Sequence, residues 1–316
     1  MTGIAKKVIA SAERAELLLE NDRIRAVLLP HDGGRLVSLV EVRSGREFIW
    51  TNSRTDILIR THGADYDNLS AGGVEEAFPT GLADRLDGME LPFFGELWPV
   101  AWRYEPSGTG DGWRLETDCG VYAARVSKEW TLIGNTLSCA YTLTNLSGLR
   151  LPYLFGVHPS LRIQPGDRLE LPRAAYTPGA MFPEGLLPPE VFEWPAAGGR
   201  DLSVAPGEDA CEYTQIYTVA AREGALAIHA VERDVRLLVR YDAAFFTSLS
   251  VWMLYGGWRG HRCVMAEFFT GWPLRLSEAA RQNGCAYLAP RETVSTVVKY
   301  AVCRDTKINN ERMLTQ

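Results

Sequence analysis

Residues 124–147 read ARVSKEWTLIGNTLSCAYTLTNLS, two runs of alternating apolar and polar residues on either side of Gly134-Asn135. Alternation with a period of two is typical of β-strands in which every second side chain faces a core. A Gly-Asn pair between two such runs is typical of a tight turn. This stretch therefore predicts an antiparallel hairpin with one buried face.

The same pattern recurs along the chain. Strand-like runs separated by turn residues extend from AELLLE (residues 15–20) to TVSTVVKYAV (residues 293–302), and they include LAIHAVE, VRLLVRYD and TSLSVWML. Helical periodicity is scarce. LRLSEAARQNG (residues 274–284) predicts one short helix closed by Gly284, and the N-terminal IAKKVIASAERAELLLE (residues 4–20) can also be read as a helix. Many short strands with few helices predict an all-β fold, a large antiparallel β-sandwich.

The chain carries no sign of a domain boundary. No long linker, low-complexity segment or internal repeat divides it. We therefore predict a single domain over residues 1–316, with about 20 N-terminal and about 14 C-terminal residues peripheral to it. The Pro/Gly-rich region 172–200 is interpreted as a long surface excursion from that domain.

The composition argues against several classes of partner. The chain has 316 residues, 46% of them hydrophobic, and a net charge of −6 without a basic block. That is enough apolar material for a large core, and we expect neither nucleic acid nor a membrane surface as a partner. No stretch approaches the ~20 apolar residues that span a bilayer, and the N-terminus lacks an apolar core of signal-peptide length. We therefore expect a cytoplasmic protein.

Cysteine and glycine patterns give no sign of a cofactor. Six scattered cysteines form no CxxC pair and no Cys/His cluster, so we expect reduced thiols and no metal site. The paired glycines lie outside any GxGxxG or GxxxxGK context, which argues against a nucleotide. We expect no cofactor, and a homodimer is one oligomeric state that the sequence allows.

The stretch YLFGVHPSL (residues 153–161) carries an ionisable side chain, His158, in a run of mostly apolar residues. One interpretation is a core histidine that hydrogen-bonds to a backbone carbonyl and has no further role. The other is a strand end that delivers an acid–base group into a pocket. These nine residues alone leave both interpretations open.

Four glutamates lie beside glycines or aromatic residues. Glu75 and Glu76 occur in NLSAGGVEEAFPTG, Glu96 in LPFFGELWPVAW, and Glu267 between CVMA and FFTGW. Each can be a solvated or ion-paired carboxylate, and each can instead line a cavity for a polar ligand with apolar faces. On an alternating strand Glu267 would share a face with Met265, where an unpaired carboxylate is costly to bury.

Tryptophans are concentrated near these acids. Sugars present hydroxyl groups to charged side chains and C–H faces to aromatic rings, so this combination favours a carbohydrate ligand. The tryptophans concerned are Trp98, Trp102, Trp252, Trp258 and Trp272. We expect only one or two of them to meet a ligand, because most tryptophans belong to a core.

Five motifs are spread over the chain from about residue 20 to residue 302. They are GGRL at 33–36, GGVEEAFPTG at 72–81, GELWPVAW at 95–102, VHPSL at 157–161 and AEFFTGWP at 266–273. In type and order this set resembles the galactose mutarotase-like superfamily, the aldose 1-epimerases and their relatives. Each motif is weak alone, and together they are more specific to the fold than to the activity.

The resemblance implies a β-sandwich with a sugar site on one concave sheet. In aldose epimerases a glutamate acts as general base on the anomeric hydroxyl and a histidine protonates the ring oxygen. The ring then opens, the C1–C2 bond rotates, and closure gives the other anomer. By position within the motifs, His158 matches the histidine and Glu267 the base. We expect them roughly 4–9 Å apart in one cleft with at least one tryptophan, because they must reach the two oxygens of one hemiacetal.

Further residues of these motifs are candidate contacts to the substrate. They are Arg35, Glu75, Glu76, Glu96, Trp98 and Trp258. Arg35 has an alternative, structural role as the ion-pair partner of Glu76 or Glu96.

The chain departs from its relatives at two places. Relatives often have a histidine before the Gly-Glu of the GELW stretch, and here that position is Phe94. Relatives often read EPTTG after the base, and here Phe268 and Phe269 follow Glu267, which predicts a more apolar site. His62 and His261 are candidates to replace the missing histidine.

Three functions follow from these observations. The leading hypothesis is a mutarotase that acts on an aldose or modified sugar. The second is a non-catalytic carbohydrate-binding or sensing protein on the same fold, which the loss of the histidine favours. The third is a glycoside hydrolase or lyase, in which Glu267 would need Glu75 or Glu96 as a second carboxylate about 5–10 Å away.

Overall fold

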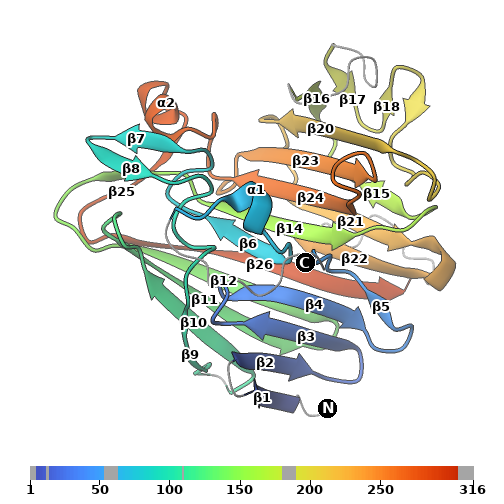
Figure 1. Cartoon of the computed structure of the whole chain (residues 1–316), viewed down its shortest axis with the longest axis horizontal. Helices are drawn as coiled ribbons and strands as arrows, with labels where there is room; N and C mark the ends of the chain where they lie inside the picture. The colour runs from blue at the N-terminus through green and yellow to red at the C-terminus, as the bar shows by residue number, and fades with distance from the viewer. Residues whose placement is uncertain (1–4, 12–13, 53–62, 109, 180–189, 305–316) are drawn as a thin grey trace.

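The computed structural model describes residues 5–11, 14–52, 63–108, 110–179 and 190–304, which form two large antiparallel sheets packed face to face (Figure 1). The predicted all-β sandwich is confirmed. Among the described residues the only α-helices are α1 (Tyr66–Leu69) and α2 (Leu276–Arg281), with one short 3₁₀ turn at Val231–Arg233. No described helix has the length and apolar character needed to cross a membrane.

The larger sheet has twelve strands and carries most of the sequence motifs. In spatial order they are β1 (Ala5–Ser11), β2 (Arg14–Glu20), β3 (Ile24–Leu29), β4 (Arg35–Glu41), β6 (Val74–Ala77), β14 (Gly156–Arg162), β24 (Arg262–Phe269), β23 (Ser248–Tyr255), β20 (Glu212–Thr218), β16 (Ala175–Pro178) and β17 (Phe192–Glu193), with β5 (Arg46–Glu47) paired to β4. β14 lies at the middle of this sheet, between β6 and β24.

The second sheet has eight strands, and three short pairs complete the fold. In spatial order the eight are β15 (Arg168–Glu170), β21 (Ala225–Ala230), β22 (Val235–Arg240), β26 (Thr293–Arg304), β12 (Thr136–Asn145), β11 (Ala124–Ile133), β10 (Gly112–Asp118) and β9 (Arg103–Pro106). The pairs are β7 (Asp84–Leu86) with β8 (Met89–Leu91), β13 (Leu151–Tyr153) with β25 (Ala286–Leu288), and β18 (Ala196–Ala197) with β19 (Arg200–Asp201).

The predicted hairpin is present as β11 and β12. Ile133 pairs with Thr136 across a two-residue turn, and Gly134 takes a left-handed φ of 59° that suits such a turn. Along β12 every second residue is buried, from Leu137 to Asn145. Alternation in the sequence thus becomes one face of the core.

Two other sequence expectations were less accurate. The helical reading of residues 4–20 is wrong, because β1 and β2 form an antiparallel pair at the edge of the large sheet. Region 172–200 is more than an excursion, because β16 and β17 extend the opposite edge of that sheet, although residues 180–189 lie outside the described part. The helix expected before Gly284 is confirmed as α2, and the Gly284 amide bonds to the Ala279 carbonyl.

A buried ion pair links the two sheets. Glu76 points from β6 into the interior, where Lys128 of β11 lies 2.6 Å from its Oε2 and the Tyr141 hydroxyl donates to its Oε1 at 2.9 Å. Both charged side chains are fully buried, and the Lys128 ammonium also lies 4.3 Å from the centroid of the Trp102 ring. Burial raises the pKa of Glu76, and Lys128 opposes that shift.

We expect Lys128→Met to destabilise the protein by about 3–5 kcal/mol, because it leaves the Glu76 carboxylate buried without its partner. The double variant Glu76→Gln/Lys128→Met should lose less of its free energy of unfolding than the single variant, since it removes both charges. Urea unfolding of the variants measures the difference, with Lys299→Met on the exposed face of β26 as the control. A single variant as stable as the parent would show that the pair is not needed.

Candidate active site

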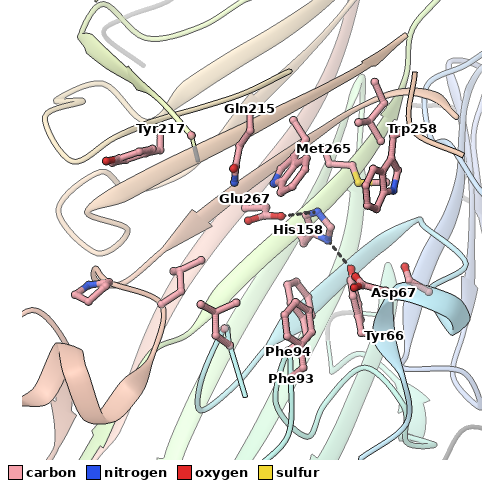
Figure 2. Close-up of a pocket in the computed structure, with 18 of the residues that line it drawn as sticks. Tyr66, Asp67, Phe93, Phe94, His158, Gln215, Tyr217, Trp258, Met265 and Glu267 are labelled. Atoms are coloured by element: carbon pink, nitrogen blue, oxygen red, sulfur yellow. Dashed lines mark hydrogen bonds and ion pairs between the residues drawn. The ribbon is translucent and has the colours of Figure 1, made fainter. Parts of the chain in front are cut away.

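A cavity of about 590 Å³ lies on the face of the large sheet turned away from the second sheet. Its floor is formed by β14, β20, β23 and β24, and its walls by α1 and by the loops that follow β6, β8, β23 and β24. Figure 2 shows His158 and Glu267 pointing toward each other near the centre, with Tyr217 and Trp258 on opposite sides.

Strand register brings the two predicted catalytic residues together. The pairing of β14 with β24 sets Val157 opposite Phe268 and Ser160 opposite Met265, so His158 lies across from Glu267. Val157 and Phe268 face the core, and alternation turns their neighbours to the cavity. His158 Nε2 lies 3.2 Å from Glu267 Oε1, closer than the expected 4–9 Å.

The other nitrogen of His158 is held by Tyr66, a residue of α1. The Tyr66 hydroxyl lies 2.8 Å from His158 Nδ1 and 2.8 Å from Glu75 Oε2. Arg35 donates to Glu75 Oε1 at 3.0 Å and also pairs with Asp32. A chain of contacts therefore runs from Arg35 through Glu75 and Tyr66 to the imidazole.

This chain determines where the imidazole carries a proton. The Arg35 guanidinium is always charged and favours Glu75 as a carboxylate, which can only accept. The single Tyr66 proton then goes to Glu75, so the Tyr66 oxygen accepts from His158 Nδ1–H. A neutral imidazole would leave Nε2 as a bare acceptor facing the Glu267 carboxylate. Nε2 is buried and has no hydrogen-bond partner among the described residues, and the Glu267 carboxylate is the acid that it faces.

Tyr66 is suited to this role because it stays protonated. Burial, followed by the nearby Glu75 charge, raises the pKa of Tyr66 well above its ordinary value. The Phe94 ring stacks on Tyr66 at 4.3 Å, and the Trp98 ring meets it edge-on at 5.0 Å. The phenol is thus fixed on two sides by aromatic rings, one of which occupies the position where relatives have a histidine.

The predicted sugar contacts divide into two groups. Trp258 lines the cavity together with His158 and Glu267. The other five are buried and do not line it: Arg35, Glu75, Glu76, Glu96 and Trp98.

The contacts of three of these residues explain why they do not reach the cavity. Glu76 points into the core toward Lys128. Glu96 accepts from the backbone amides of Val121 and Tyr122 at 3.0 and 3.2 Å, and so anchors a turn. The alternative expectation that Arg35 pairs with Glu76 or Glu96 is wrong, because Arg35 pairs with Glu75 and Asp32.

The expected apolar character of the site comes from different residues than predicted. Phe268 faces the core and stacks on Tyr241 at 4.2 Å, and Phe269 is buried behind Phe94. The cavity is instead lined by Phe93, Phe94 and four tryptophans, namely Trp50, Trp252, Trp258 and Trp272.

The cavity contains one residue that the sequence did not predict, Tyr66, and one that it named as a candidate, His261. Tyr66 was missed, because it lies in a four-residue helix with no strand pattern and no motif around it. His261 lines the cavity, with its ring 4.8 Å from that of Trp50, whereas His62 lies outside the described residues.

Comparison with known proteins bears on the fold. A family described as a domain of unknown function (DUF5107) matches residues 8–86, and a search of the curated proteins found no match. The Slr1438 protein of Synechocystis sp. PCC 6803 is similar with a TM-score of 0.68 and 16% identity, over 95% of this chain and 96% of that one. A galactose mutarotase-like protein from Clostridium acetobutylicum is similar with a TM-score of 0.68 and 15% identity, over 96% of this chain and 99% of that one. A protein from Escherichia coli K12 with the provisional name aldose 1-epimerase is similar with a TM-score of 0.65 and 15% identity, over 96% of this chain and 100% of that one.

The chain has the galactose mutarotase-like fold. The resemblance inferred from the five motifs is thus confirmed at the level of the fold. At such low identities the likeness extends no further, because one fold carries many activities. What this mutarotase-like chain does has to be argued from its site.

The contacts of His158 make a spectroscopic prediction. When His158 is neutral, we expect its proton on Nδ1, and Tyr66→Phe should move it toward Nε2 because the acceptor is lost. Long-range ¹H–¹⁵N spectra of histidine-labelled protein report the tautomer, and His158→Asn assigns the signal among the five histidines. Tyr217→Phe, which removes another hydroxyl of the cavity, is the control. An Nε2–H tautomer in the parent would contradict the assigned chain.

Proposed function

We propose that this chain interconverts the anomers of a sugar, as an aldose 1-epimerase does. The observation that carries the proposal is the contact of His158 with Glu267 at 3.2 Å in a cavity with aromatic walls. The hydroxyl-bearing O1 and the ring oxygen of a pyranose are bonded to the same carbon. Two groups that lie side by side can therefore reach both of them.

The proposed steps use one proton at each oxygen. Glu267 accepts the proton of the anomeric hydroxyl while His158, as imidazolium, donates its Nε2 proton to the ring oxygen. The C1–O bond of the ring breaks, and C1 becomes the aldehyde carbon. After rotation about C1–C2, the ring closes with the two proton transfers reversed. The enzyme and the total number of protons are unchanged.

Tyr66 and Glu75 are positioning residues in this scheme. Because Nδ1–H is held by the Tyr66 oxygen, the imidazole ring cannot turn without losing that contact. The proton available for transfer is then the one on Nε2, which faces Glu267. Phe94 supports Tyr66 by stacking at 4.3 Å, and the centroid of its ring lies 5.1 Å from that of His158.

The alternatives receive less support from the geometry. A hydrolase of the kind considered from the sequence needs Glu75 or Glu96 beside Glu267. Glu75 is held by Arg35 and Tyr66, and Glu96 by backbone amides, and neither lines the cavity. A binding protein would use the same aromatic walls without the proton transfers, and the activity measurement distinguishes it.

We expect Glu267→Gln and His158→Asn each to lower kcat for anomer exchange by about 10²–10⁴-fold, since each removes one proton-transfer group. The losses should not add in the double variant, because both groups act on one transition state. Exchange is measured by NMR over a panel of sugars, and affinity by calorimetry. Glu105→Gln, an exposed carboxylate on β9, is the control.

The outcome also decides between the two leading functions. Sugar affinity should change much less than kcat in both variants, because the aromatic walls remain. A parent protein that binds sugars of the panel but accelerates none of their anomerisations would favour the binding protein and end the proposal.

A further inference from the structure

We infer that the substrate is a neutral reducing oligosaccharide of at least two rings, with its reducing end at His158 and Glu267 and the next ring over Trp252 toward Trp258. The inference rests on the proposed anomer exchange, and it adds the substrate class. Four features of the cavity support it: its volume, the course of its floor along β23, its aromatic rings and the charges of its lining residues.

The cavity is larger than one sugar ring requires. A hexose has twelve heavy atoms, and even at the spacing of liquid water, about 30 Å³ per oxygen, it would take no more than about 360 Å³. The cavity holds about 590 Å³. The remaining space is enough for much of a second ring.

Strand register shows the direction in which this space extends. Ser250 of β23 lies opposite Glu267, and Trp252 and Leu254 follow on the same face of that strand. At about 3.4 Å per residue, the floor extends about 14 Å from the catalytic row to Leu254. Trp258, in the turn after β23, also lines the cavity, and its ring lies 5.8 Å from that of Tyr213, which pairs with Leu254.

Free aromatic surface lies along the same direction. Trp252 lines the cavity and is partly exposed, and none of the described aromatic rings stacks on it. At the opposite end Trp272 is stacked on Tyr217 at 4.7 Å with an interplanar angle of 15°. One face of each of those rings is therefore already covered. Trp252 is therefore the ring on which we place the second pyranose, whose C–H face packs on an aromatic ring.

The charges of the lining favour a neutral ligand. Besides Glu267, the acids Asp67 and Glu278 line the cavity. The cationic candidates there are Arg275, which donates to the Ala83 carbonyl, and the histidines. A phosphate or sulfonate would meet this excess of acids without a cluster of bases.

The experiment compares matched sugars that differ only by the second ring. The pairs are glucose with maltose and with cellobiose, xylose with xylobiose, mannose with mannobiose, and galactose with galactobiose. Anomer exchange is measured by NMR and binding by calorimetry. For at least one pair we expect the disaccharide to bind about tenfold more tightly and to have a kcat/KM higher by a similar factor, as burial of roughly 60 Å² of C–H surface would give.

Two variants test the direction of the second ring. Trp252→Ala should remove most of the preference for the disaccharide, because it removes the ring on which the second sugar packs, whereas Trp272→Ala at the opposite end should retain it. Circular dichroism and thermal unfolding verify that both variants are folded. Loss of the preference in Trp272→Ala but not in Trp252→Ala would overturn the assigned direction.

Failure of the inference can be told from failure of the proposed function. Exchange that is equally fast for every monosaccharide and its disaccharide, with equal affinities, overturns the substrate class and leaves the mutarotase intact. If no sugar shows catalysed anomer exchange, the proposed mutarotase function is overturned. The affinities measured by calorimetry then still show whether the cavity prefers one ring or two. Cleavage of a disaccharide into two monosaccharides would overturn both.

Discussion

Two consecutive glutamates on one strand of a sandwich must point to opposite faces, and this constraint organises the molecule around β6. Glu76 points inward and neutralises Lys128 of the second sheet, while Glu75 points outward and neutralises Arg35 beside the cavity. Each carboxylate is buried, and each has a cation of its own, which is the condition under which buried charge is tolerated. A slip of one residue would exchange the two faces and bring Val74 or Ala77 to one of the two glutamate positions, so one of these cations would lose its glutamate. The element that holds the sheets together is therefore the same one that positions the site.

The sequence was most informative where local pattern determines the outcome. Alternation predicted the β11–β12 hairpin, and the motifs identified His158 and Glu267, which the structure brings into contact. Alternation also implies that Glu75 and Glu76 face opposite sides. It does not say which side is the core, because that depends on the sheet that packs against β6. The partner of Arg35 and the part played by Tyr66 arise from segments far apart in the chain, and no local pattern encodes such contacts.

The charge arrangement separates two kinds of carboxylate at the site. Glu75 is saturated by Arg35, Tyr66 and Ser70, so it acts as a fixed acceptor. Glu267 has 12% of its side chain exposed and faces only His158 among the described ionisable groups within ion-pair distance. A saturated carboxylate suits orientation, whereas a carboxylate with a free face suits proton exchange with a ligand.

The central place of β14 also has a consequence for how the protein folds. Its neighbours β6 and β24 carry Glu75 and Glu267, which are 192 positions apart in the chain. Joining such distant segments closes large loops, and chains rich in non-local pairings fold slowly, on a scale of milliseconds to seconds for small domains. The hairpin β11–β12 is local and needs no such closure. We therefore expect the contact between His158 and Glu267 to form late, so that a chain arrested earlier would have much of its second sheet and no site.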